Sequence, residues 1–313
     1  MAIRRGPLAQ PESGTEVFHP VNGGPDHNSV PFPTDFVITT TQGAGSDNWT
    51  LTRLLGETYM KTNGTDAEQG YNFQNIFADM TGTDWGTAGW WSPSATNTVG
   101  WHWKRAPGFF DAVAYTGSNS DSTINHNLGV APEMMWVKRR DGSNPWRVFV
   151  PSVSGMLRLN DTSALDTSNA KYYFGDNNNI IAPTDTEFTV TAGTGDVNSG
   201  TQLYIAYLFA TVPGVSKVGS YTGNGSSQTI DCGFTSGARF VLIKNANAVS
   251  VWLVYDTVRG ITTSNDPFLQ LNSTAAESSF DNLIEPDTSG FKVRTTDDSI
   301  NSSGDTFIFY AIA

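Results

Sequence analysis

Acidic side chains are the residues of this sequence whose types and spacing come closest to catalytic chemistry. A glycosidase needs two carboxylates that face one bond, and the candidates are Asp256, the pair Asp297–Asp298, and Asp185 with Glu187. We interpret all of them as solvated turn carboxylates. The run 176–179, Asp-Asn-Asn-Asn, offers oxygen ligands of the kind that Ca²⁺ prefers. Whether such loop carboxylates bind calcium stays open at this point.

The other reactive residue types form no constellation along the chain. His19, His27, His102 and His126 stand in separate segments without ligand spacing, and His126, in Asn-His-Asn-Leu-Gly, is typical of a turn. There is no Gly-x-Ser-x-Gly elbow and no phosphate-binding glycine motif. The single cysteine, Cys232, allows no intrachain disulfide and suits a small buried apolar position. We therefore expect no catalytic residue, no cofactor and no metal.

Three tryptophans stand close together in a segment rich in Gly, Ser and Thr. Trp85, Trp90 and Trp91 are rigid aromatics beside adaptable polar turns. Such rings stack on sugar faces or anchor protein interfaces, and they are the candidate ligand or interface residues. Packing inside the first repeat or between subunits is the interpretation we prefer, with carbohydrate contact as the alternative.

The composition predicts an all-β protein that binds neither nucleic acid nor the membrane interior. Aromatic residues make up 12% and charged residues only 15%, with many Gly, Ser, Thr, Asn and Asp, which suits short strands and tight turns. The net charge of −12 repels phosphate backbones. The longest apolar stretch, 203–210, is too short to span a bilayer. Arg4 and Arg5 are followed by Pro and Gly, which excludes an ordinary secretory signal.

A repeated segment divides the chain into tandem units. Residues 107–117, from Pro-Gly to Tyr-Thr-Gly, recur as 213–223, and further matches follow at nearly the same offset, such as Trp146 with Trp252. Asp256 has no counterpart in the matching segments, which argues against a catalytic role. The matches predict a second repeat over 108–213 and a third over 214–313. Alternating apolar residues predict seven or eight strands per repeat, arranged as tandem β-sandwiches of jelly-roll or immunoglobulin size.

Residues 36–107 are interpreted as a divergent first repeat. Trp49 stands for Trp146 and Trp252, all three as core residues, and 101–103, Trp-His-Trp, stands for the last strand of the repeat. The opening strand with Tyr-Thr-Gly is missing, so we expect the N-terminal arm or another chain to cover that edge.

Residues 1–35 form an arm rich in Pro and Gly that cannot make long ladders of main-chain hydrogen bonds. It is either a flexible leader or an extended arm that docks on a neighbouring subunit. The apolar residues Phe18, Val21, Val30 and Phe32 give such an arm something to bury, and they are the candidate assembly residues.

The frame of the second and third repeats resembles a module of tailed-bacteriophage virion proteins, notably of phages that infect marine bacteria and cyanobacteria. The resemblance is carried by 115–117 (Tyr-Thr-Gly), 136–138 (Trp-Val-Lys), 157–160 (Leu-Arg-Leu-Asn) and their partners in the third repeat, such as 289–291 (Ser-Gly-Phe). It covers residues 108–313 well and 36–107 loosely.

The resemblance implies a non-enzymatic virion structural protein, a tail-fibre or baseplate-associated subunit involved in host attachment. The alternatives are a capsid-decorating or head-fibre protein and, less favoured, a glycan-binding or glycan-degrading tail protein. It further implies a homo-oligomer, with a trimer favoured, and assembly in the host cytoplasm. Contacts with other virion proteins would run through the arm, and host-surface glycan is a further expected partner.

Overall fold

The computed structural model describes residues 9–23, 30–70, 76–77, 80–83, 97–263, 265–281 and 283–313. This part of the chain is all-β, as predicted: it contains antiparallel sheets, short 3₁₀ turns and no α-helix. Accordingly, no helix in these ranges is long and apolar enough to cross a membrane.

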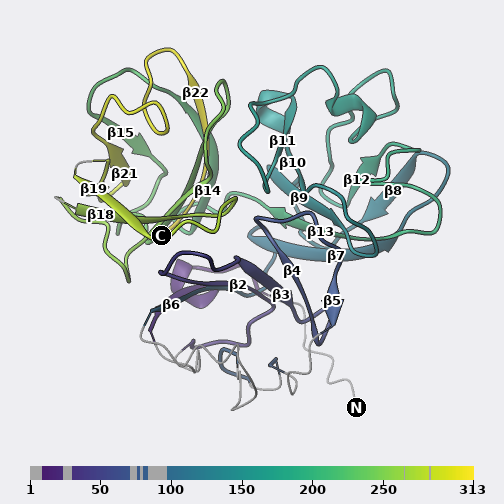
Figure 1. Cartoon of the computed structure of the whole chain (residues 1–313), viewed down its shortest axis with the longest axis horizontal. Helices are drawn as coiled ribbons and strands as arrows, with labels where there is room; N and C mark the ends of the chain where they lie inside the picture. Colours follow the sequence, from purple (N-terminus) through teal and green to yellow (C-terminus); the bar gives the residue numbers. More distant parts are fainter. Residues whose placement is uncertain are drawn as a thin grey trace.

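Three large antiparallel sheets organise the molecule (Figure 1). We call the segments that build them the first unit (residues 14–104), the second unit (105–210) and the third unit (211–313). The sheet of the first unit contains, in spatial order, β1 (Phe18–Asn22), β6 (Thr98–Trp103), β2 (Phe36–Thr41), β3 (Trp49–Thr52), β4 (Thr58–Lys61) and β5 (Gln69–Gly70). The sheet of the second unit contains β7 (Phe110–Thr116), β13 (Leu203–Phe209), β9 (Met134–Arg139), β10 (Arg147–Val150) and β11 (Gly155–Arg158). The sheet of the third unit contains β14 (Ser216–Thr222), β22 (Thr306–Ile312), β16 (Phe240–Asn245), β17 (Leu253–Asp256), β18 (Asn265–Gln270) and β19 (Ser278–Asp281).

A smaller sheet covers the outer face of the large sheet in the second and third units. In the second unit this layer is β8 (Ser122–Asn125) with β12 (Glu187–Val190). In the third unit it is β15 (Gln228–Asp231), β21 (Gly290–Val293) and β20 (Ile284–Asp287). Each pair of layers encloses its own apolar cluster, so both units are the β-sandwiches that the sequence predicted.

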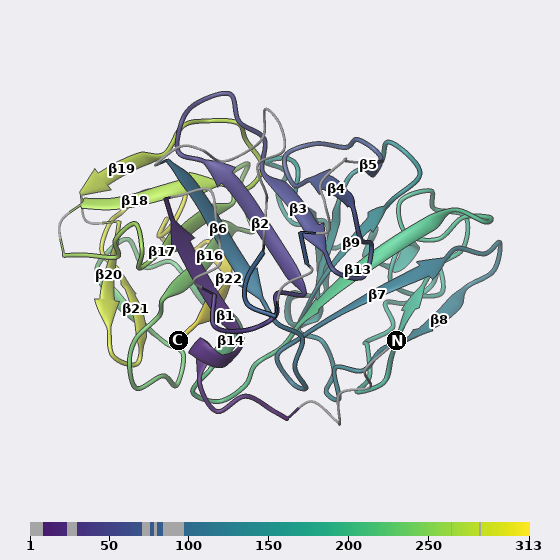
Figure 2. The same ribbon diagram turned by 90° about the horizontal axis from the view of Figure 1, so that it is seen from below.

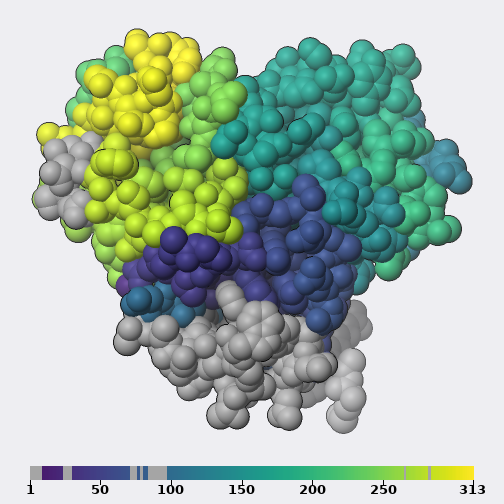
Figure 3. Space-filling view, viewed as in Figure 1, coloured from purple at the N-terminus to yellow at the C-terminus, as the bar shows by residue number. Residues whose placement is uncertain are grey.

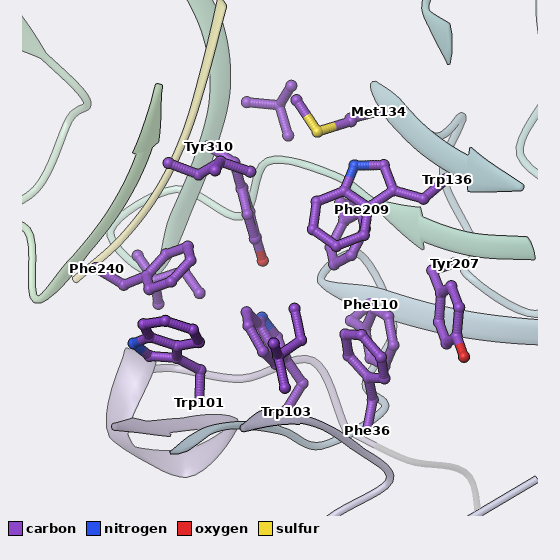
Figure 4. Close-up of a cluster of buried hydrophobic side chains, with 14 of the residues drawn as sticks. Phe36, Trp101, Trp103, Phe110, Met134, Trp136, Tyr207, Phe209, Phe240 and Tyr310 are labelled. Carbon is purple, nitrogen blue, oxygen red and sulfur yellow. The ribbon is translucent and has the colours of Figure 1, made fainter. Parts of the chain in front are cut away.

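The inner faces of the three large sheets meet in one shared core. Figure 4 shows aromatic side chains from all three units pointing at one another. Phe36 lies 4.4 Å from Tyr207, Phe209 lies 5.1 Å from Tyr310, and Trp103 lies 5.5 Å from Phe240, measured between ring centroids. One such contact therefore joins each pair of units. This explains why strands such as β13 are apolar on both faces: one face lies in the sandwich and the other in the shared core.

Equivalent main-chain hydrogen bonds close the three units into a ring. The amide N–H of Glu68 donates to Arg140, that of Leu165 to Ala246, and that of Glu277 to Gln42, each to the carbonyl oxygen, over 2.6, 2.8 and 2.8 Å. The bonds run from the first unit to the second, from the second to the third, and from the third back to the first. The arrangement is therefore pseudo-threefold within a single chain, and the three lobes and their contacts are visible in Figure 3.

A second set of equivalent bonds corrects the sequence alignment of the first repeat. Trp146 and Trp252 donate their indole N–H, each over 2.8 Å, to the carbonyls of Lys61 and Arg158 in the preceding unit. In the first unit the same place is taken by Asn48, whose amide donates to the Gln270 carbonyl over 2.9 Å.

The main-chain N–H groups of Trp146, Trp252 and Asn48 also have equivalent partners, since they donate to the side-chain oxygens of Asn160, Asn272 and Asn63 respectively. Trp49, the expected counterpart, is buried one residue further along. It stacks on Tyr59 at 4.2 Å in a separate cluster of the first unit. The prediction of buried core tryptophans is confirmed, but the alignment was off by one.

The opening strand of the first repeat, expected to be missing, is present as β1. It pairs with β6, as β7 pairs with β13 and β14 with β22 (Figure 2). The turn before each opening strand is also equivalent: the N–H groups of Val17, Phe109 and Val215 donate to Gly14, Ala106 and Val212. The arm therefore covers this edge within its own chain, which was one of the two expected solutions.

Candidate functional site

Asp256 forms a buried structural ion pair. This corrects the prediction that its side chain is a solvated turn carboxylate. Its side chain is fully buried with that of Arg259, and Arg259 Nε donates to Asp256 Oδ2 over 2.6 Å. The indole N–H of Trp101 donates to the same oxygen over 2.8 Å. Arg259 also binds Glu277. Because these partners come from the first and third units, the carboxylate joins two units and is shielded from any substrate.

The remaining candidate acids are exposed turn residues, as predicted. Asp185, Glu187, Asp297 and Asp298 face the solvent. The carboxylate of Asp297 accepts the main-chain N–H of Ser299 over 2.8 Å, which closes a local turn.

The calcium alternative gains no support at 176–179. Oδ1 of Asp176 accepts the N–H groups of Asn178 and Asn179 over 3.0 and 2.7 Å. The bond from Asn179 is the main cause that lowers the pKa of this carboxyl. Within the described residues, no three His, Cys, Asp or Glu side chains are grouped to hold a metal ion.

The described histidines and the cysteine are structural. His126 donates its Nε2–H to the Thr184 carbonyl and accepts the Leu128 N–H at Nδ1, so both ring nitrogens hold a turn, as predicted. Burial lowers its pKa. Cys232 is buried, and desolvation raises the pKa of its thiol to about 12, which fits the predicted apolar role.

The candidate assembly residues are buried in the chain that carries them. The exposed fractions of Phe18, Val21, Val30 and Phe32 are 0, 8, 0 and 3%. Phe18 packs between Trp103 and Phe240, with ring centroids 5.0 Å apart in both contacts. Val21, Val30 and Phe32 form a separate apolar cluster within the first unit. All four side chains are therefore already buried within one chain and offer no exposed surface to a neighbouring subunit. Trp85, Trp90, Trp91 and His27 lie outside the described residues.

Two buried lysines escaped the sequence reasoning, although they belong to the repeated frame. Lys138 and Lys244 occupy the same position in β9 and β16, and both are fully buried. Lys244 Nζ donates to the carbonyls of Asn245, Ala248 and Thr162, and Lys138 Nζ to those of Arg139 and Gly142. Desolvation lowers the pKa of each to about 8. The main-chain cages give these ammonium groups a structural role in the hairpin loops.

A groove of about 760 Å³ lies where the second unit meets the third. One wall belongs to the second unit and is mainly Ala and Pro, including Ala131, Pro132, Ala182 and Pro183, with the polar residues Glu133 and Ser152. The opposite wall consists mostly of β14 and β15, the edge strands of the two layers of the third unit. The first wall is thus largely apolar, and the second presents strand edges with several polar side chains. Sequence reasoning missed the groove because one wall comes from separate segments of the second unit and the other from the third unit.

Residues 23–313 match a domain of unknown function, DUF7483. The chain belongs to this family. The match extends over all three units, so the family domain corresponds to the ring rather than to one repeat, and β1 lies just before it. No curated protein matches the chain.

Proposed function

We propose that this protein is a non-enzymatic structural protein of a tailed-bacteriophage virion, in a tail fibre or baseplate that contacts the host surface. The similarity of its repeats to virion modules supports the proposal. The observation that carries it furthest is the closed ring, because three units with one shared core make a rigid scaffold. A module displayed on a particle needs such rigidity more than it needs a reactive centre.

The surroundings of the acidic residues support a structural role over glycan degradation. Asp256 is enclosed by Arg259 and Trp101, and Asp176 is occupied by main-chain N–H groups. A depolymerase would need two carboxylates free to face a sugar. Release of reducing ends from host polysaccharide by the purified protein would contradict the proposal.

The trimer that the resemblance implies stays a proposal and needs a surface other than the shared core. The inner faces of the three sheets are already buried within one chain. Light scattering of the purified protein tests the point: a trimer has about three times the chain mass of 33.8 kDa. A monomer would indicate that one chain supplies the threefold arrangement that three subunits would otherwise provide.

The decisive test of the proposal is the place of the protein in the particle. Mass spectrometry of purified virions should detect it in stoichiometric amounts, and gold-labelled antibody should mark the tail tip in electron micrographs. Label on the head would favour the alternative, a capsid-decorating or head-fibre protein. Absence of the protein from purified particles would overturn both.

A glycan-binding role is the less favoured alternative and is tested by a glycan array. Binding that disappears in Trp90→Ala and Trp91→Ala variants would support it, since aromatic rings carry sugar contacts. An array without signal would leave the structural role as the better account.

A further inference from the structure

The outer edge of β14 presents unpaired main-chain groups to the groove between the second and third units. The N–H of Gly223 donates to Asp305, and that of Ala313 to Val215, each to the carbonyl. Because the hydrogen-bonded residues of an antiparallel strand alternate, residues 216, 218, 220 and 222 point their main-chain groups away from β22. This edge is the one that lines the groove.

Side chains bind one main-chain group each of Val218 and Thr222, whereas both groups of the residue between them are open. The N–H of Val218 donates to the Thr211 hydroxyl over 3.1 Å, and the carbonyl of Thr222 accepts the Gln228 amide over 3.1 Å. Between them stands Ser220, which is exposed. No other group of the described chain binds its main-chain N–H or C=O. An added strand pairs with an edge strand through the N–H and C=O of the same residue, and both groups of Ser220 are open.

In the equivalent seam between the third and first units, a side chain bridges this opening. There the residue that corresponds to Ser220 is Asn22, and its amide donates to the Val258 carbonyl across the seam. In the groove the corresponding residues are Ser220 and Ser152, both lining the space. A shorter side chain therefore leaves the seam open where its equivalent is bridged.

We infer that this groove binds an extended polypeptide segment of a partner protein, which pairs with β14 through the main chain of Ser220 and lays apolar side chains on the wall of the second unit. The site favours a peptide over a glycan, because an edge strand supplies ladder hydrogen bonds and the facing wall is mainly Ala and Pro, with Glu133 and Ser152 among them. The inference is independent of the proposed virion role. It would hold for any setting in which the protein meets an extended chain.

The test begins with a dodecapeptide display library selected on the intact protein, with counterselection on the Ser220→Pro variant. Proline removes the open N–H while leaving the bonds to β22, since those belong to the neighbouring residues. We expect enriched peptides rich in alternating apolar residues. In fluorescence polarisation their affinity for Ser220→Pro should fall by about tenfold or more, as the loss of one or two main-chain bonds implies.

Two further variants guard against a merely structural effect. Ala114→Pro places the same change at the corresponding edge residue of β7, and it should leave binding unchanged. Ser220→Asn copies the bridge of Asn22 without backbone strain, and it should weaken binding as Ser220→Pro does. N-methylation of alternate residues of a selected peptide should abolish binding in one register and spare it in the other.

Three results would overturn the inference. The first is that no peptide is enriched above the counterselection. The second is that the selected peptides tolerate N-methylation at every residue. The third is that the intact protein binds a glycan array or self-associates, and that the Ser220→Pro variant loses this property instead. Such a result would assign the groove to a glycan or to a second copy of the chain.

Discussion

Lys138 and Lys244 show how a repeated residue can carry charge into the core without a carboxylate partner. Each ammonium group donates only to main-chain carbonyls, at the same place in two units. In the first unit Thr40 takes this position, and its hydroxyl donates to the Asp47 carbonyl. The position therefore requires a donor that reaches the hairpin loop, and lysine fills it at the cost of desolvation.

Stability should rise between pH 8 and pH 10 because of these two lysines. Each pKa falls from 10.5 in the unfolded chain to about 8 in the folded one. In that window the unfolded state therefore binds more protons, and the free energy of unfolding increases with pH by up to about 3 kcal/mol per lysine. Urea unfolding from pH 7.5 to 10 measures the slope, and Lys138→Met with Lys244→Met should remove it.

Cys232 opposes this rise from about pH 9, because burial raises the pKa of its thiol from 9.0 to about 12 and the unfolded chain therefore loses this proton first. Near pH 10 the tyrosines act in the same direction as Cys232. Burial raises the pKa of Tyr207 above its usual value, so ionisation in the unfolded chain lowers stability at higher pH. A slope between pH 8 and 10 that persists in the double lysine variant would contradict the assignment.

Replacing Asp256 by alanine should destabilise the protein by about 3 kcal/mol, because Arg259 would lose its fully buried partner and keep only the more exposed Glu277. The side chains of both residues are fully buried. Chemical denaturation measures the loss. The second unit supplies the matched control: the residues that correspond to this pair are Val150 and Val153. The double variant Asp256→Val, Arg259→Val should recover most of the stability, and equal losses in the single and double variants would refute the ion-pair account.

At the scale of elements, β1 shows how a proline-rich arm can complete a sheet. Pro20 lies opposite Trp101 in the middle of the strand. The N–H of Gly23 donates to Thr98, and that of Lys104 to Val17, so the residues bonded to β6 are those on either side of Pro20. Proline is tolerated there because its missing N–H would face away from the sheet. The arm is thus compatible with an edge strand although its composition suggests irregular structure.

Phe18→Ala should cost about 3–5 kcal/mol, since a fully buried aromatic side chain is removed from the core shared by the first and third units. Thr15→Ala, at an exposed position of the preceding turn, serves as the control and should change stability by less than about 0.5 kcal/mol. Unfolding in urea distinguishes the two. A Phe18→Ala protein as stable as the parent would mean that β1 docks only loosely. For the same reason, removal of residues 1–35 should unfold the first unit.

At the scale of the whole molecule, Ala313 lies beside the start of the first unit, where a further unit junction would stand. An equivalent hydrogen bond closes the end of each unit. The N–H groups of Lys104, Ala210 and Ala313 donate to the carbonyls of Val17, Phe109 and Val215, respectively. A β-carbon added to Gly14 would lie 1.9 Å from the Ala313 carbonyl oxygen. Ala313 is thus followed in space by Ser13, as Ala210 is followed in sequence by Thr211.

A circular permutant should therefore fold. Its chain would run from Thr211 to Ala313, continue directly into Ser13, and end at Ala210. Its new ends take the place that corresponds to the natural ones, so we expect a free energy of unfolding within about 2 kcal/mol of the parent. Circular dichroism and urea unfolding provide the measurement. A control permutant opened inside β13, between Ala206 and Tyr207, should not fold. If both permutants behaved alike, the ring would not be the unit of stability.

Much of this architecture could be predicted from the sequence, and the failures have physical causes. The repeat register was right where apolar alternation is strong: Trp101 corresponds to Tyr207 in the strand pairing. It failed at Asn48, because an amide and an indole donate the same hydrogen bond although the residues share no other property. The groove could not be predicted, since its walls come together only when the second and third units pack.

The sequence by itself determined most strands of the second and third units and their sandwich layers, because alternation and turn residues are local properties of the chain. Only the tertiary structure decided that the repeats close into a ring. Closure depends on contacts such as Phe36 with Tyr207 and Trp103 with Phe240, which join residues that are far apart in the sequence. For the same reason, only the tertiary structure decided where the arm packs. Phe18 could have been buried against any apolar surface, and its place was fixed by the edge of β6 that the first unit left open.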